Sequence, residues 1–102
     1  MLSNKVIWIS GGSTGIGKST AIKFVEKNWI VVVTARNKDN LQKLKEEINN
    51  KFKMNKFYIF TCDNTIKEQV KKTVDKIEGE VGPIELVLLN AGTTHPYSNE
   101  FN

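Results

Sequence analysis

A glycine-rich segment near the N-terminus is the part of this sequence best suited to chemistry. Residues 10–17 read S-G-G-S-T-G-I-G and follow directly on a short apolar run. A dinucleotide pyrophosphate needs backbone N–H donors, which a helix N-terminus supplies together with the positive end of its dipole. Glycines permit the sharp turn, the close approach of the phosphate and tight packing of the helix on the strand. We expect three glycines and two hydroxyl donors to form this site: Gly11, Gly15, Gly17, Ser13 and Thr14.

The same segment also fits a different motif. Residues 12–19, G-S-T-G-I-G-K-S, match the nucleoside triphosphate pattern G-x-x-x-x-G-K-S, in which Lys18 reaches the β- and γ-phosphates and Ser19 binds Mg²⁺. Such a protein needs a carboxylate at the end of a later apolar strand to hold the metal. The apolar run at 86–89 is followed by Asn90 instead. A P-loop nucleotide triphosphatase is therefore the second hypothesis.

Arg36 follows a second apolar run, about 20 residues after the glycines, where a dinucleotide-binding domain reads the adenosine ribose. A carboxylate at this point accepts a hydrogen bond from the 2′-hydroxyl and selects NAD. A guanidinium instead forks onto a 2′-phosphate and stacks on adenine. Because Arg36 stands here with Lys38 close by, we expect NADP(H) to be favoured over NAD(H).

The elements that must position these groups alternate along the chain. Continuous β-prone apolar runs predict strands at 5–10, 30–35, 57–62 and 85–90, and apolar residues at helical spacing predict helices at 18–28, 39–52 and 65–78. The expected inward residues are Ala21, Ile22, Val25, Trp29, Leu41, Leu44, Ile48, Phe52, Ile66, Val70, Val74 and Ile77. Either Asn37 or Asp39 is expected to cap the second helix. This alternation predicts an α/β fold, a Rossmann-type doubly wound parallel sheet with strand order 3-2-1-4.

Composition excludes several classes of protein. With 39% hydrophobic and 25% charged residues, the 102-residue chain is expected to be one globular domain. The net charge is +4, but the lysines are scattered, so we expect no nucleic-acid partner. Cys62 and His95 are the single residues of their types, which leaves neither a disulfide nor a metal site, and Cys62 is expected to fill core space near a strand end. The first apolar run is too short for a signal peptide or a membrane span, so a cytoplasmic protein without a membrane partner is expected.

Taken together, these residues resemble the short-chain dehydrogenase/reductase family. The signature turn of that family reads T-G-x-x-x-G-x-G. Here Ser10 replaces the threonine, and the remaining defined positions match, with an isoleucine between the last two glycines: Gly11, Gly15, Ile16 and Gly17.

The resemblance implies two further groups of cofactor contacts. Asp63, after the third predicted strand, is similar to the family aspartate that contacts the adenine amine. The family motif N-N-A-G, beside the adenosine ribose, corresponds to Leu89, Asn90, Ala91 and Gly92, with leucine in place of the first asparagine.

The resemblance also implies what lies outside this chain. The catalytic groups of the family are an Asn, a Ser and the Tyr and Lys of a Y-x-x-x-K helix, beyond the fourth strand. Tyr58 and Tyr97 are followed four positions later by Cys62 and Phe101, so no catalytic residue is assigned.

We therefore expect residues 1–102 to be the incomplete dinucleotide-binding domain of an NADP(H)-dependent oxidoreductase acting on a small alcohol or ketone, without the catalytic half and inactive by itself. A non-catalytic nucleotide-binding remnant is the third hypothesis. The apolar fourth strand suits coverage on both faces. In this chain we expect its edge to be unpaired and partly exposed, which favours a homo-oligomer or aggregation.

Overall fold

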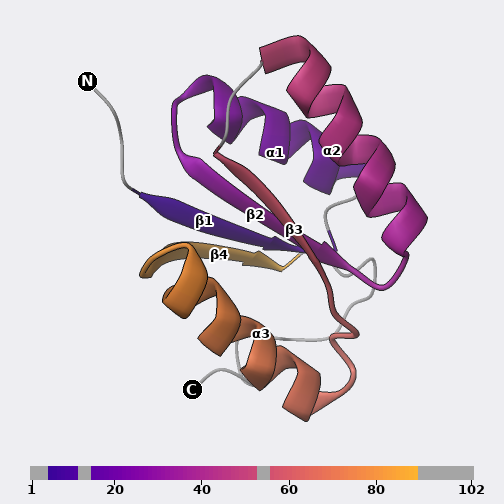
Figure 1. Ribbon diagram of the computed structural model, residues 1–102, viewed down its shortest axis with the longest axis vertical. Helices are drawn as coiled ribbons and strands as arrows, with labels where there is room; N and C mark the ends of the chain where they lie inside the picture. Colours follow the sequence, from indigo (N-terminus) through magenta and orange to yellow (C-terminus); the bar gives the residue numbers. More distant parts are fainter. Residues whose placement is uncertain (1–4, 12–14, 53–55, 90–102) are drawn as a thin grey trace.

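The computed structural model describes residues 5–11, 15–52 and 56–89. Strands and helices alternate in the order β1 (Val6–Ser10), α1 (Gly15–Glu26), β2 (Ile30–Ala35), α2 (Lys38–Phe52), β3 (Phe57–Thr61), α3 (Lys67–Glu80) and β4 (Ile84–Leu89). The four strands form one parallel sheet in the order β3-β2-β1-β4 (Figure 1). The predicted fold class and strand order are confirmed.

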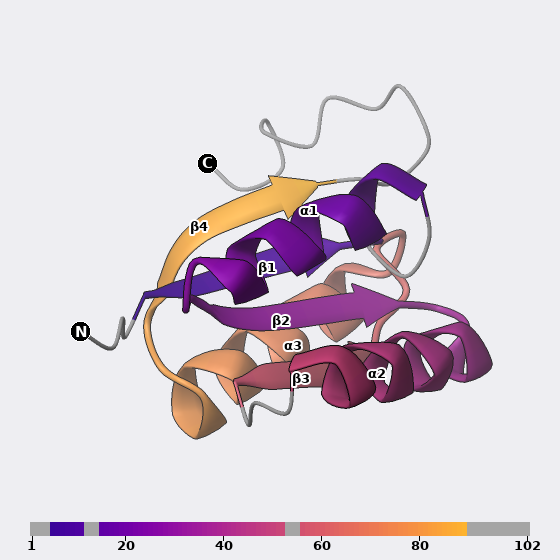
Figure 2. The ribbon, with the colours of Figure 1, turned by 90° about the horizontal axis from the view of Figure 1, so that it is seen from above.

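Helices cover both faces of this sheet. Figure 2 shows α1 and α2 on one face and α3 on the other. Successive side chains of a strand point to opposite faces, so Ile7 and Ile9 pack toward α1 and α2, whereas Val6 and Trp8 pack toward α3. The uninterrupted apolar character of β1 follows from this arrangement, because each of its side chains meets a covered face.

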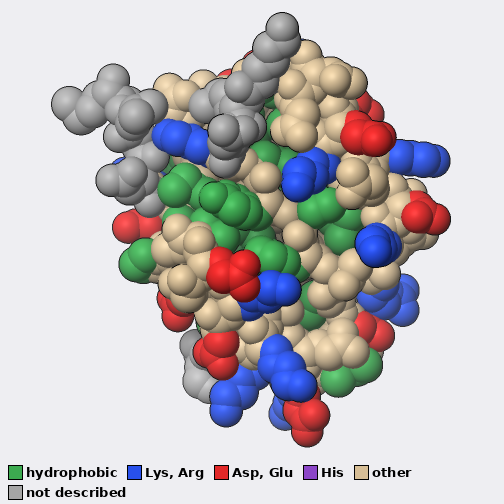
Figure 3. Space-filling view, viewed as in Figure 1, with side chains coloured by type: hydrophobic (Ala, Val, Ile, Leu, Met, Phe, Trp, Pro, Cys, Tyr) green, Lys and Arg blue, Asp and Glu red, His purple; other side chains and the backbone are tan. Residues whose placement is uncertain are grey.

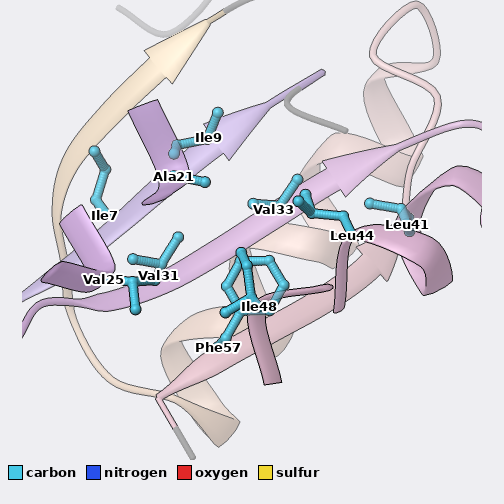
Figure 4. Close-up of a cluster of buried hydrophobic side chains, with 10 residues drawn as sticks. All are labelled: Ile7, Ile9, Ala21, Val25, Val31, Val33, Leu41, Leu44, Ile48 and Phe57. Carbon is cyan, nitrogen blue, oxygen red and sulfur yellow. The ribbon is translucent and has the colours of Figure 1, made fainter. Parts of the chain in front are cut away.

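The larger core lies between the sheet and the α1–α2 layer (Figure 4). Its ten buried members come from β1, β2, β3 and the inward stripes of the two helices: Ile7, Ile9, Ala21, Val25, Val31, Val33, Leu41, Leu44, Ile48 and Phe57. Burying one such aliphatic side chain stabilises the fold by about 1.5–3 kcal/mol. Predicted inward residues of α1 and α2 occupy this layer, and Ile22, Trp29 and Phe52 pack against it while partly buried.

The core beneath α3 is smaller and contains one buried polar link. Val6, Trp8, Val32 and Ile77 form its centre. The indole Nε1 of Trp8 donates a hydrogen bond of 2.9 Å to Oγ1 of Thr34. The polar edge of the buried indole is thereby satisfied across the β1–β2 pair.

Helix α1 differs from its predicted limits at both ends. It begins at Gly15 instead of Lys18 and ends at Glu26 instead of Asn28. The early end has a backbone cause. Asn28 adopts a φ of 65°, and its N–H donates to the carbonyl of Val25, so the chain turns from the helix axis into β2.

Helix α3 is displaced toward the C-terminus relative to the prediction. It begins at Lys67 instead of Thr65 and runs through Gly79, which was expected in the turn, to Glu80. Ile66 precedes the helix and is 42% exposed, so its predicted inward position is wrong. The reason is that Oδ1 of Asp63 accepts a hydrogen bond from the backbone N–H of Thr65 and holds that residue in a turn ahead of the helix.

Strand β4 is paired differently from the other strands. Among the described residues it has one hydrogen-bonded neighbour, β1, and the register shifts so that Ile84 lies opposite Val6 while Leu86 lies opposite Ile7. The side chains of Leu86 and Val87 are 43% and 40% exposed. The expected partial exposure of this apolar strand is confirmed for the described residues.

Surface charge is mixed. On the face drawn in Figure 3, lysine and arginine side chains are interspersed with aspartate and glutamate. None of the described helices combines the length and apolarity that a transmembrane segment requires.

Candidate cofactor-binding site

The carboxyl ends of the strands meet along one edge of the sheet. Ser10 pairs with Thr34 of β2 and with Leu89 of β4, and Ala35 pairs with Thr61 of β3. From β1 the chain builds outward through β2 and β3, then returns to place β4 on the opposite side of β1. The strand order therefore reverses between β1 and β4. Open parallel sheets bind ligands outside the carboxyl ends of their strands at such a reversal.

The turn that follows β1 depends on glycine conformations. Gly11 has a φ of 78°, and its N–H donates to the carbonyl oxygen of Thr34 over 2.7 Å, which anchors the start of the turn to β2. Gly15 has a φ of 61° where α1 begins, and, apart from its chain neighbours and the backbone of its own helix, no atom of the described residues lies within 4 Å of the position that a Cβ would occupy. Gly17 is buried within α1. Open space beside a helix N-terminus fits an approaching phosphate group.

The other predicted contact residues after β1 and after β4 divide into one residue that the structure describes and five that it does not. Ile16, in the first turn of α1, is 75% exposed, an unusual position for a large aliphatic side chain. Ser13 and Thr14 lie outside the described residues, as do Asn90, Ala91 and Gly92 after β4. Their predicted contacts stay predictions.

Lys18, the cation of the triphosphate motif, pairs with a carboxylate of a neighbouring helix. It is the fourth residue of α1, and its Nζ lies 2.8 Å from Oε2 of Glu47 on α2. The ammonium group is thereby engaged by a neighbouring helix. Within the described ranges, no group of three or more His, Cys, Asp or Glu residues could hold a metal ion. The P-loop hypothesis gains no support from this geometry.

Arg36 lies directly after β2, and its side chain is exposed. The next residue, Asn37, accepts a hydrogen bond of 3.0 Å from the backbone N–H of Asn40 and so caps α2. Of the two predicted capping residues, Asn37 is therefore the one that caps. Lys38 begins α2 and is also exposed. Two cationic side chains thus stand beside the carboxyl end of β2.

Asp63 is held by a local hydrogen-bond network after β3. Its Oδ1 accepts from the backbone N–H of Thr65 at 2.9 Å and from the Thr65 hydroxyl at 2.6 Å. Its own N–H donates to Oε1 of Gln69 at 2.9 Å. The Thr65 hydroxyl, the Thr65 N–H and the nearby charge of Arg36 together lower the pKa of Asp63, and partial burial opposes them. Asp63 is therefore an oriented carboxylate, and it forms a turn instead of capping α3.

Asn64 is a residue of this region that the sequence analysis did not identify. Its Nδ2 donates a hydrogen bond to Oγ of Ser10, whose side chain is 1% exposed. The Sγ of Cys62, buried at the end of β3 as predicted, lies 3.9 Å from Oδ1 of Asn64. The sequence did contain one signal. Ser10 ends a strand that was predicted to be buried, so its hydroxyl requires a hydrogen-bond partner, and Asn64 is a polar residue beside Asp63.

Comparison with known proteins gives these observations a family context. The family model described as short chain dehydrogenase matches residues 5–101. An uncharacterized oxidoreductase of Listeria monocytogenes is 36% identical over 91 residues, which cover 89% of this chain and 36% of that protein.

Solved structures of the same kind align well. A short-chain type dehydrogenase/reductase from Mycobacterium marinum superposes with a TM-score of 0.76 at 38% identity, covering 84% of this chain and 34% of that one. A short chain oxidoreductase from Pseudomonas aeruginosa PAO1, solved with NADPH bound, superposes with a TM-score of 0.80 at 26% identity, covering 84% and 34%.

The chain spans about a third of the length of these relatives. The matched part of this chain includes the parallel sheet, the glycine turn and the residues that follow β2 and β3. Because the family model matches nearly all of the sequence, from residue 5 to residue 101, this chain belongs to the short-chain dehydrogenase family of oxidoreductases.

Proposed function

We propose that the carboxyl edge of the sheet binds NADP(H). The pyrophosphate lies at the turn that Gly11 and Gly15 form before α1, the adenosine 2′-phosphate lies at Arg36, and the adenine amine donates to Asp63. The observation that carries the cofactor choice is the exposed guanidinium of Arg36 at the end of β2, with Lys38 beside it. A guanidinium pairs with phosphate in a bidentate way, an interaction that a 2′-hydroxyl cannot provide. The solved relative that holds NADPH supports the same choice.

The reaction of the whole protein follows from that cofactor. We propose hydride transfer between an alcohol and a ketone, with a small carbonyl compound or alcohol as the substrate and the cytoplasm as the location. Bound nicotinamide supplies the hydride chemistry, and the residues of this chain bind and orient the adenosine and pyrophosphate parts. Ser13, Thr14 and Ile16 at the turn, together with Asn90, Ala91 and Gly92 after β4, complete the proposed binding site.

Titration of the protein with NADPH and NADH, followed by nucleotide fluorescence, tests the proposal. Arg36→Asp removes a charge-assisted contact with the 2′-phosphate and is expected to weaken NADPH binding about 10- to 150-fold while strengthening NADH binding. The matched control is Lys51→Asp, which makes the same charge change in the last turn of α2, whereas Arg36 lies just before the first turn of that helix. Equal NADPH affinity before and after Arg36→Asp would contradict the assignment.

A further inference from the structure

The loop that joins β3 to α3 contacts β1, although β2 lies between β1 and β3 in the sheet. The order β3-β2-β1-β4 separates the ends of β1 and β3 by one strand. Asn64 nevertheless donates from Nδ2 to Oγ of Ser10, the last residue of β1. The loop therefore crosses the carboxyl end of β2 and connects the residues on its two sides.

The carboxamide of Asn64 is oriented by contacts at both of its ends. Its Oδ1 faces Sγ of Cys62, a weak donor at 3.9 Å, and its Nδ2 faces the Ser10 hydroxyl. Ser10 and Cys62 are 1% and 3% exposed. Because both partners are buried, the carboxamide of Asn64 satisfies a hydroxyl that bulk water does not reach.

The two residues joined to Asn64 lie next to different parts of the proposed nucleotide site. Ser10 directly precedes Gly11, whose N–H is bound to Thr34 where the phosphate turn begins. Asn64 directly follows Asp63, which is fixed separately by Thr65 and Gln69. The internal shape of the Asp63 loop thus has its own hydrogen bonds, and the bond to Ser10 sets where that loop lies relative to the turn.

From this geometry we infer that Asn64 is a positioning residue that couples the adenine end of the site to its phosphate end. The inference rests on the proposed nucleotide function. With the Asn64–Ser10 bond in place, the two ends are held relative to one another before the dinucleotide binds. Without the bond, each end still binds its own part of the ligand. A ligand that spans both ends must then also order them relative to one another, which lowers its affinity.

Calorimetric titration with two probes distinguishes coupling between the two ends of the site from a role of Asn64 in protein stability alone. NADPH spans both ends, whereas adenosine 2′-monophosphate reaches the Arg36–Asp63 end alone. Asn64→Leu, close in volume but unable to donate, is expected to weaken NADPH binding about 5- to 10-fold and to change adenosine 2′-monophosphate binding less than about 2-fold. Ser10→Ala is expected to do the same, and the double variant should be no weaker than either single variant, because one bond is lost in all three. Ser10→Thr keeps a hydroxyl at this position and should therefore retain most of the NADPH affinity that Ser10→Ala loses.

Thr73→Val is the matched control, because it removes another part-buried hydroxyl bond, the one from Thr73 to the Gln69 carbonyl within α3. It should alter thermal stability without changing the ratio of the two affinities. Equal losses for both probes in Asn64→Leu, or additive losses in the double variant, would overturn the inference. If the unaltered protein binds neither probe, the proposed function itself fails, which is a distinguishable result.

Should the variants fail to fold, amide exchange in the unaltered protein decides the question. Coupling predicts that adenosine 2′-monophosphate, bound at the Arg36–Asp63 end, slows exchange of the Gly11 N–H in the turn as well as that of Asp63. Slower exchange confined to the loop after β3 would show that the two ends are independent.

Discussion

Strands β1 and β4 are hydrogen-bonded neighbours with similarly apolar sequences, V-I-W-I-S and I-E-L-V-L-L, yet they differ sharply in burial. All five residues of β1 are buried, whereas three of the six residues of β4 are exposed. Strand β1 has a neighbour on each side and a helix layer over each face. Among the described residues β4 has one neighbouring strand. Its main core contacts are Leu88, which packs against the larger core, and Ile84, which packs against the core beneath α3. Apolar composition therefore indicates which strands tolerate burial, and the number of covering elements decides how much of each strand is buried.

The comparison also concerns function. The carboxyl end of β1 is held in place by a backbone bond from Gly11 to Thr34 and by the Ser10–Asn64 link. The body of β4 presents exposed aliphatic side chains instead. The first region has the fixed geometry that a nucleotide site needs, and the second is an exposed apolar edge that favours association.

Core truncation should give the largest difference between the two strands. Ile9→Ala in β1 removes a fully buried side chain and should lower the free energy of unfolding by about 2–5 kcal/mol. Leu86→Ala in β4, where the side chain is 43% exposed, should cost about 1 kcal/mol or less. Urea denaturation followed by tryptophan fluorescence measures both. Equal losses at the two positions would show that β4 is covered in solution.

The turn after β1 should be the position most sensitive to a change in nucleotide binding. Gly15→Val places a β-branched side chain at a φ of 61° and in the space proposed for the phosphate, so NADPH binding should fall below detection in a fluorescence titration. Lys18→Ala, in the same helix, should leave the NADPH dissociation constant within about 2-fold, since its ammonium already pairs with Glu47. Loss of binding in Lys18→Ala, together with a requirement for Mg²⁺, would instead favour the triphosphatase hypothesis.

The exposed edge of β4 should control self-association. Wild-type protein is expected to dimerise or aggregate through this strand, and replacing Leu86 and Val87 by lysine should shift sedimentation toward the monomer. The matched double change at exposed positions of α2, Gln42→Lys with Asn49→Lys, adds the same two positive charges away from the edge and should have little effect. A wild-type protein that sediments as a monodisperse monomer, with a sharp and high melting transition, would contradict the prediction.

The smallest effect concerns the carboxylate beside Arg36. The pKa of Asp63 is lower in the folded chain than the usual value of about 3.9, so its contribution to stability is present above that value and is lost as the pH falls through the lower folded-state pKa. The difference in unfolding free energy between wild type and Asp63→Asn should stay constant from about pH 7 to pH 5 and shrink below about pH 4. Urea denaturation across this range measures it, with Asp75→Asn as the control. A difference that grows below pH 4 would mean that the shift has the opposite sign.

Local patterns in the sequence determined the element order and the residues of the α1 and α2 stripes, and the preference for right-handed crossovers then favoured the observed strand order. Strand runs, helical periodicity and glycine conformations act over a few residues and can be recognised without the fold. The position of Arg36 at a strand end and the resemblance of the glycine turn likewise depend on order and spacing alone. These signals were sufficient to propose the carboxyl edge of the sheet as the nucleotide site.

The tertiary structure alone decided how distant residues meet. The pairing of Lys18 with Glu47 and the reach of Asn64 over β2 to Ser10 each depend on where a crossover places its loop or helix. Ser10 and Asn64 are 54 positions apart, too far for any local preference to predict their hydrogen bond. Burial of β4 was likewise not encoded in its own residues, because solvent exposure depends on which elements pack around a strand and not on how apolar the strand is.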